Sequence, residues 1–279
     1  MSSMPLIVSH KSALDFYRLS DERLVASLPR VRDAKALSRT VPEPSCLPKV
    51  ADYGLELPIS VLNNSSSRLR NSSSFEYRRF AVAPPRSYLK LGDGRFVCSP
   101  ELVFLQLAGS LSFLELICLG YELCGIYSDE KNERLGVLGR MPLTSVSKIE
   151  DVLLLCAGVN HVVKARRALS YVIDGSASPM ETALCMRLSL PYSLGGYAIP
   201  RPLLNERIGF ADRVGSDLGR SFCCCDLSWP EFRLAVEYDS DFHASSQKIF
   251  KDADRRNALL ALGVEIITCL LYTSPSPRD

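Results

Sequence analysis

Hydrophobic and polar positions change their spacing several times along the chain. Residues 10–40 are predicted to be helical, because "SHKSALDFYRL" has apolar residues at helical spacing and "SDERLVASL" opens with a Ser-Asp-Glu helix-start signal. From Pro58 to Val97, the segments "LPISVL", "FEYRRFAVA" and "SYLKLGDGRFVCS" are short and rich in β-branched or aromatic residues, with polar turns between them. This pattern predicts strands, and the dipeptide Asp93-Gly94 predicts a hairpin between two of them.

Helices are predicted after this strand-rich middle. Residues 99–101 combine a cap residue, a proline and an acid in the order typical of a helix start. Leu102 to Cys124 predicts two packed helices, residues 145–173 predict two more, and "SPMETALCMRLSL" predicts another after a sharp turn. From Arg220 onward the pattern predicts strand, strand, helix and strand, with the helix from about Ser246 to Leu262.

These elements predict an α/β protein in two parts. A mixed α/β region is expected over residues 1–140, and a second α/β domain over residues 141–268. After the predicted strand "GVEIIT", the last eleven residues, "CLLYTSPSPRD", form a tail rich in Ser and Pro where the strand should continue or turn. This tail resembles read-through of sequencing-adapter bases, so we expect residues 269–279 to be non-native and the native sequence to end near Thr268.

Composition narrows the class of protein only a little. The chain has 279 residues, 47% hydrophobic and 23% charged, with a net charge of +2, so any argument for nucleic-acid binding must come from local patches. None of the ten cysteines forms a CxxC pair, which argues against structural zinc and against a secreted disulfide framework. We therefore expect buried thiols and a cytoplasmic protein. Because Gln106 and Glu115 interrupt the most apolar stretch, we expect no membrane span.

Acidic residues on two neighbouring predicted strands suggest a metal site. In "FRLAVEYD" the apolar residues fall on one face of a strand, and Glu237 and Asp239 fall together on the other. Asp226 precedes them on another strand, and a turn at Trp229-Pro230 can bring it beside Glu237. Glu181 begins a helix just before this sheet. Carboxylate oxygens are the ligands that Mg²⁺ prefers, so convergence of these acids predicts a cation site.

The order and spacing of these acids, with the residues that follow them, carry a resemblance to a known family. The pattern consists of Asp226-x10-Glu237-x-Asp239, His243, Asp252-x-x-Arg255 and "LLALGVEIIT". Over residues 174–268 it resembles the very-short-patch-repair-like branch of the PD-(D/E)XK nuclease superfamily. The resemblance implies a restriction-endonuclease-like domain, with a mixed sheet flanked by helices.

The resemblance also implies a role for each acid. Asp226 and Glu237 would bind Mg²⁺ or Mn²⁺, Glu181 would be the acid of the first helix, and His243 would transfer a proton. Asp239 stands where the broad superfamily has a lysine. These five residues are therefore candidate catalytic residues, and Asp226 and Glu237 are also candidate metal ligands.

The N-terminal half carries a second resemblance. The segments "VSHKSALDFYRL", "GRFVCSPELVFLQLA" and "LSFLELICLGYELCG" resemble the antitoxin-type protein of AbiE abortive-infection systems. This implies a surface that faces DNA or a cognate toxin protein. Residues 68–90 hold six basic residues and one acid, with aromatic residues between them, which predicts a phosphate-binding sheet face. The candidate nucleic-acid-binding residues are Arg68, Arg70, Arg78 and Arg79, with Arg255 from the other half.

Each candidate also has a purely structural explanation. Glu181 completes a capping box with Ser178. Glu237 and Asp239 also fit a solvated strand face, the basic run also fits a solvated surface, and a histidine such as His243 is often a loop residue.

Taken together, the sequence predicts a metal-dependent endonuclease that hydrolyses DNA phosphodiester bonds in defence or repair. The alternative is a non-catalytic, DNA-binding regulator of antitoxin type. A protein-binding module is the third hypothesis, with the least support.

Overall fold

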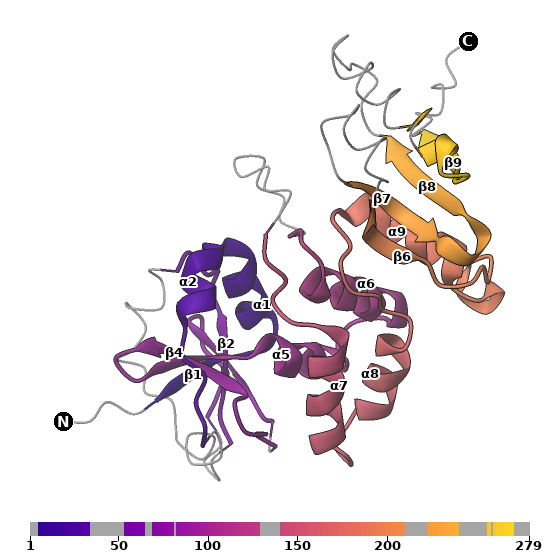
Figure 1. Cartoon of the computed structure of the whole chain (residues 1–279). Coiled ribbons are helices and arrows are strands. Elements are labelled where there is room, and N and C mark those ends of the chain that lie inside the picture. The colour runs from indigo at the N-terminus through magenta and orange to yellow at the C-terminus, as the bar shows by residue number, and fades with distance from the viewer. Residues whose placement is uncertain are drawn as a thin grey trace, which may run out of the picture. The chain divides into compact units, whose positions relative to one another are not determined.

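We describe the protein from a computed structural model (Figure 1). The described residues are 5–33, 53–64, 69–80, 82–128, 140–209, 222–239, 256–257 and 259–270. The chain divides into two compact units, residues 1–174 and 175–279. Both are mixed α/β units in which helices flank a mixed sheet, as the sequence predicts at this level.

The first unit is built on a five-stranded sheet in the order β3-β2-β1-β5-β4. The pairs β1–β5 and β2–β3 are parallel, whereas β1–β2 and β4–β5 are antiparallel. The predicted hairpin at Asp93-Gly94 is confirmed, because both residues adopt the positive φ angles that such a turn requires, 47° and 76°. The strands are Leu6–Val8 (β1), Ile59–Leu62 (β2), Phe75–Arg78 (β3), Tyr88–Gly92 (β4) and Arg95–Cys98 (β5).

Helix α5 is the centre of this unit. Every one of its residues is buried, and it packs against α1, α6, α7 and α8 (Figure 1). Its start is fixed as the sequence predicts, because the side chain of Ser99 accepts the Leu102 N–H and Pro100 occupies the first turn. The helices of the unit are His10–Leu19 (α1), Glu22–Ser27 (α2), Pro100–Leu107 (α5), Phe113–Cys124 (α6), Val146–Leu155 (α7) and Val162–Leu169 (α8).

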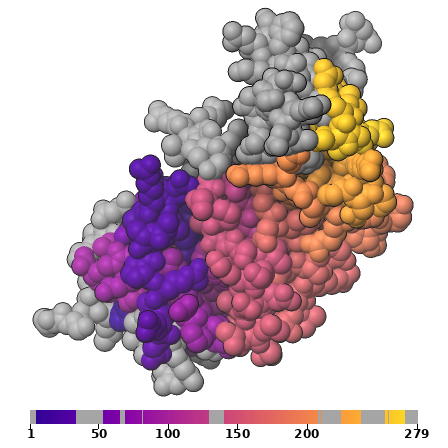
Figure 2. Space-filling view, viewed as in Figure 1, coloured from indigo at the N-terminus to yellow at the C-terminus, as the bar shows by residue number. Residues whose placement is uncertain are grey.

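The boundary between the units differs from the predicted position near residue 140. Helices α7 and α8 pack on α5 and α6, so the boundary lies between Asp174 and Gly175. The Met141 N–H donates to the Glu22 carboxylate at 2.9 Å, which joins the segment after residue 140 to α2. On the face in Figure 2, the indigo surface of the first helices accordingly borders the rose surface of the later ones.

Two buried carboxylates tie the helices of the first unit to other segments. Arg30 binds Glu101 through two hydrogen bonds of 2.9 and 3.0 Å, and Thr144 donates a third at 2.7 Å. Arg18 binds Glu122 in the same bidentate way, at 2.6 and 2.8 Å. Burial would raise the pKa of Glu101, but the hydrogen bonds and charge of Arg30 outweigh it, so this pKa lies below its ordinary value.

The second unit holds a four-stranded sheet in the order β6-β7-β8-β9. β6–β7 and β7–β8 are antiparallel and β8–β9 is parallel, and α9 packs against β7. Cys225, Ala235 and Leu259 form a small buried core, against which Val264 and Ile266 pack. The elements are Pro179–Ser189 (α9), Tyr192–Leu194 (η2), Leu203–Gly209 (β6), Phe222–Trp229 (β7), Pro230–Phe232 (η3), Leu234–Asp239 (β8) and Glu265–Leu270 (β9).

The expected burial of the thiols is found for some of the described cysteines and not for others. None of them is in a disulfide, and Cys98, Cys124, Cys156, Cys185 and Cys225 are buried. Burial raises the pKa of Cys98 to about 12, so this thiol stays protonated, and its sulfur accepts the Gln106 side-chain N–H at 3.4 Å. Cys118 and Cys224, in contrast, are exposed. In the part of the chain that the structure describes, no helix combines the length and apolar character needed to cross a bilayer.

We predict that Arg30→Ala lowers the free energy of unfolding by about 2 kcal/mol at pH 7, measured by urea denaturation. This loss of stability is smaller than the loss expected for a fully buried ion pair, because the Arg30 side chain is 35% exposed. The pKa of Glu101 is lowered from 4.5 in the folded wild type, so the contribution of the pair is complete above about pH 4.5 and disappears as pH falls through the lower, folded value. The deficit of the variant should therefore shrink in acid.

Lys11→Ala is the matched control for this prediction. It removes one cation from an exposed pair with Asp15, whose atoms lie 3.1 Å apart, and should change the free energy of unfolding by less than about 0.5 kcal/mol. Equal effects of the two substitutions would contradict a special role for the buried pair.

Candidate functional site

The predicted acids meet where β7 and β8 lie side by side. The antiparallel register pairs Leu227 with Val236, and its continuation by one residue sets Asp226 opposite Glu237. Residues that stand opposite one another on antiparallel strands share a face of the sheet. The Asp226 carboxylate accepts the backbone N–H of Tyr238 at 2.7 Å, so it lies over β8 rather than pointing away from it.

The residues in register with Asp226 and Glu237 are polar on all four strands of this sheet. In the register of β6 with β7, Asn205 falls opposite Asp226, and on the other side Glu237 pairs with Thr268 of β9. We call Asn205, Asp226, Glu237 and Thr268 the polar row. Asn205 has a φ of 50°, a left-handed conformation that is unusual inside a strand and marks an irregularity there.

Glu181 reaches the polar row from the first turn of α9. Its Oε2 accepts the Asn205 side-chain N–H at 2.8 Å and the Ala177 backbone N–H at 2.9 Å, and its Oε1 accepts the Ser178 hydroxyl at 3.1 Å. The predicted cap is present, since the Ser178 Oγ accepts the Glu181 N–H at 3.1 Å. The carboxylate does not return to the Ser178 N–H, however, but binds Ala177 and Asn205 instead.

Electrostatics couple Glu181 to Asp226. Burial raises the pKa of Glu181 most, and the negative charge of Asp226 raises it further, against the opposing hydrogen bonds from Asn205, Ala177 and Ser178. Glu181 is only 8% exposed, and no cation is among its described partners. A buried acid with a raised pKa beside a second acid is an arrangement common at functional sites.

The structure thus brings Glu181, Asp226 and Glu237 to one region of the second unit. Asp239 is the last residue of β8 and pairs with Leu270, but its side chain, like the whole of His243, lies outside the described residues. Among the residues described, no group of three or more His, Cys, Asp or Glu side chains is close enough to hold a metal. Asn205 belongs to no sequence motif, and only the register of β6 with β7 places it beside these acids.

The predicted basic sheet face is divided by the fold. β3 and β4 lie at opposite edges of the five-stranded sheet, so the two ends of residues 68–90 do not form one continuous surface. Phe75 and Tyr88, expected between the cations, are 1% and 0% exposed and belong to the core. Arg70 and Arg79 do converge, because with Tyr77 they line a hollow of about 540 Å³ beside β3. Of the remaining candidates, Arg78 ends β3, whereas Arg68 and Arg255 lie outside the described residues.

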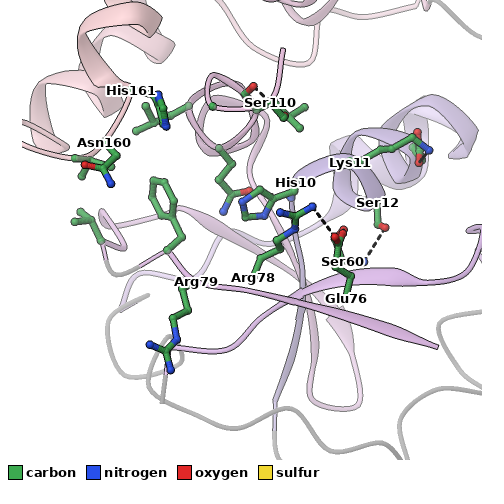
Figure 3. A pocket seen from close by; sticks show the side chains of 18 of the residues that line it. His10, Lys11, Ser12, Ser60, Glu76, Arg78, Arg79, Ser110, Asn160 and His161 are labelled. Carbon is green, nitrogen blue, oxygen red and sulfur yellow. Dashed lines mark hydrogen bonds and ion pairs between the residues drawn. The ribbon is translucent and has the colours of Figure 1, made fainter. Parts of the chain in front are cut away.

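A larger cavity of about 1070 Å³, which shares Arg79 with this hollow, lies in the first unit (Figure 3). Its wall includes Arg78 and Arg79 and the two histidines His10 and His161. Arg78 is held by Glu76 in an ion pair of 2.6 Å. The cavity therefore joins a paired arginine to polar groups from α1 and from the start of α8.

Both histidines of this cavity are held in unusual backbone conformations. His10 and His161 have φ angles of 49° and 66° at the starts of α1 and α8. Burial, and then the charge of Arg78, lower the pKa of His10 to about 4, so its imidazole is neutral at pH 7. The His161 ring lies so close to Gly109 that a Cβ there would come within 2.9 Å of it.

Comparison with known proteins adds no assignment. No protein-family profile, no curated protein and no solved structure shows a significant match to this chain.

We predict that Glu181→Gln makes the unfolding free energy less dependent on pH. A carboxyl whose folded pKa is raised costs nothing below its unfolded pKa of about 4.5, and it destabilises the fold increasingly as pH rises through the folded value. Wild type should therefore lose stability relative to Glu181→Gln as pH rises from about 4.5 through the raised folded pKa, measured by urea denaturation at a series of pH values. A difference that stays constant with pH would contradict the raised pKa.

Proposed function

We propose that the protein is a metal-dependent endonuclease that hydrolyses DNA phosphodiester bonds. The observation that carries the proposal is the meeting of Glu181 with Asp226, at the level where Glu237 stands opposite on the next strand. A sheet seldom gathers acids in this way without a cation or a proton to offset their repulsion. The resemblance of residues 174–268 to PD-(D/E)XK nucleases supports the same class of protein.

The donor set fits a hard divalent cation. Mg²⁺ binds through one or two carboxylates and keeps several waters, so Asp226 and Glu237 would suffice to hold it. The bond from the Tyr238 N–H to Asp226 is the kind of contact that orients a ligating carboxylate. When bound, the metal supplies polarisation of a phosphoryl oxygen and a bound water with a lowered pKa.

The chain's own residues would divide the remaining tasks. Glu181, with its raised pKa, holds a proton to higher pH than an ordinary carboxyl and fixes the Asn205 amide beside Asp226. Asp239 and His243 follow on the same segment, and we propose that they orient the attacking water and transfer a proton. In this proposal Asp239 replaces the lysine of the broad superfamily, so it acts on water rather than as an obligatory ligand.

The first unit would supply affinity for the phosphate backbone. Arg70 and Arg79 share one hollow and Arg78 lies beside them at the end of the edge strand β3, so three cations gather within a short segment. Arginines clustered beside a strand edge suit sequence-independent phosphate contacts. A cognate toxin protein is the alternative occupant of this surface.

The second candidate function is a non-catalytic, DNA-binding regulator of antitoxin type. It is favoured by the fact that Glu181 and Asp226 both bind backbone N–H groups, so both carboxylates also have structural tasks. In that protein the nuclease-like unit would dock on DNA without cleaving it. Cleavage in the presence of a divalent cation separates the two functions.

We predict that Glu237→Gln lowers the rate of plasmid nicking by at least about 10²-fold, because a catalytic cation contributes several kcal/mol to transition-state stabilisation. DNA affinity should stay the same or increase, since less negative charge then faces phosphate. The measurement is the initial nicking rate against Mg²⁺ and Mn²⁺ concentration, with affinity measured in parallel by fluorescence anisotropy.

Glu231→Gln is the matched control, because Glu231 is an exposed acid on the turn between β7 and β8. It should nick at the wild-type rate. Wild-type protein that binds DNA but shows no nicking with either metal would favour the regulator instead.

We predict that replacing Arg70 and Arg79 by Ala weakens DNA binding equally for all sequences. Each phosphate that the variant no longer neutralises should reduce the slope of log K against log salt by about 0.9, so the double substitution should reduce it by nearly 2. The control double variant replaces Arg23 and Lys148, two exposed cations of the same unit on α2 and α7. Equal salt slopes for the two double variants would remove this surface from the proposal.

A further inference from the structure

The turn between α9 and β6 displays two exposed tyrosines on a rigid backbone. Tyr192 and Tyr197 are 76% and 50% exposed, whereas Tyr17, Tyr88 and Tyr121 of the first unit are at most 2% exposed. Aromatic side chains normally contribute their area to a core or an interface, so exposed ones on an ordered turn indicate a surface that contacts something else. We call residues 191–199 the tyrosine turn.

Backbone hydrogen bonds hold the tyrosine turn against the end of α9. The N–H groups of Tyr197, Ala198 and Ile199 donate to carbonyl oxygens of Arg187, Leu190 and Leu188 at 2.9 to 3.0 Å. The turn is also joined to the sheet, because the indole N–H of Trp229 donates to the Pro200 carbonyl at 2.6 Å.

A glycine is required where the turn approaches α9 most closely. A Cβ on Gly196 would overlap the Leu190 carbonyl oxygen, and the neighbouring Gly195 adopts a φ of 85°. These residues fix the conformation of the turn before any ligand binds, so little conformational entropy remains to be given up on binding.

Arg187 covers part of the Tyr197 ring. The centre of its guanidinium lies 4.8 Å from the ring centroid, Nη2 donates to the tyrosine hydroxyl at 3.3 Å, and Nη1 donates to the Gly195 carbonyl at 2.6 Å. A guanidinium fixed over an aromatic ring presents a planar cation beside a planar apolar surface. Heterocyclic bases stack on both kinds of surface.

Charge complementarity selects the class of ligand. Between residues 187 and 205 the chain contains two arginines, Arg187 and Arg201, and no acidic residue, and both arginines are exposed. A polyanion with planar apolar groups matches this combination better than a neutral apolar partner does. Single-stranded DNA carries both features, one phosphate and one base per nucleotide.

The tyrosine turn lies a short distance along α9 and β7 from Glu181 and Asp226. Glu181 and Arg187 are six residues apart on α9, about 9 Å along the axis, and Asp226 and Trp229 are three residues apart on β7, about 10 Å along the strand. With a rise of about 3.4 Å per stacked nucleotide, this interval corresponds to roughly three nucleotides.

We infer that the tyrosine turn, with Arg187, is a stacking platform for an unpaired base of the DNA strand that reaches Asp226 and Glu237. The inference rests on the DNA ligand of the proposed function and deepens it by naming a single-stranded or locally unpaired substrate. The platform binds the base by stacking, and the acids act a few nucleotides away.

The test uses the full chain and an oligo-dT strand that carries one 2-aminopurine, compared with a fully paired hairpin of the same length. Wild type should quench the 2-aminopurine fluorescence and bind the single strand more tightly than the hairpin. Tyr197→Leu should remove the quenching and weaken binding about tenfold, within the range for removal of one base–aromatic stack. Tyr197→Phe keeps the ring and should keep the quenching, which separates stacking from the hydroxyl's hydrogen bond with Arg187.

Phe232→Leu is the matched control, since Phe232 is an aromatic residue of the same unit that is 62% exposed but lies outside the tyrosine turn. It should bind as wild type does. The ratio of wild-type to Tyr197→Leu affinity should stay constant between about 50 and 200 mM salt, because stacking is not screened as phosphate contacts are. Equal binding by wild type and Tyr197→Leu, or an equal weakening in Phe232→Leu, overturns the inference.

The outcomes also separate this inference from the proposed endonuclease. Binding and nicking without quenching would overturn the platform and leave the endonuclease intact. Quenching that depends on Tyr197, without nicking in Mg²⁺ or Mn²⁺, would support the platform and overturn the endonuclease in favour of the regulator. If the wild-type protein binds neither the oligo-dT strand nor the hairpin, both the platform and the endonuclease are overturned. The tyrosine turn would then be a surface for a protein partner.

Discussion

The cost of burying a carboxylate governs how both units are built. A charged acid removed from water must gain hydrogen bonds or a partner of opposite charge, or else retain its proton. Glu101 and Glu122 meet this requirement with Arg30 and Arg18, each through a bidentate contact. Because these arginines come from the N-terminal segment and the acids from helices 71 and 104 residues later, each pair also fixes a long-range contact.

Glu181 meets the same requirement differently, and this difference makes it a candidate for function. Its described partners are an amide, a hydroxyl and a backbone N–H, so its negative charge is not neutralised, and Asp226 adds repulsion. The first unit shows that this chain can place an arginine opposite a buried acid. A site that must bind a cation or hold a proton cannot do so, since a permanent arginine would remove the charge that attracts the cation.

Local patterns predicted most of the secondary structure because the signals are short in range. The Ser99-Pro100 start of α5 and the Asp93-Gly94 hairpin depend only on backbone preferences of a few residues, and both are present. The unit boundary could not be predicted in this way, since it depends on α7 and α8 packing against helices far away in sequence. Likewise, sequence spacing identifies Asp226 and Glu237 as candidates, whereas Asn205 is identified only by the register of β6 with β7. The separation of β3 from β4 depends on the order of strands in the sheet, which local sequence does not determine.

The irregularity at Asn205 lies on the edge strand β6, beside the acids of the neighbouring strands. A regular ladder would use every strand N–H for a strand carbonyl, leaving side chains to find partners elsewhere. Here the Tyr238 N–H binds the Asp226 carboxylate, and the left-handed Asn205 directs its amide to Glu181 and to the Gly175 carbonyl. The backbone departs from regular strand geometry at the same level of the sheet where the acids lie. In the proposed endonuclease, this irregularity would hold the Asn205 amide against Glu181.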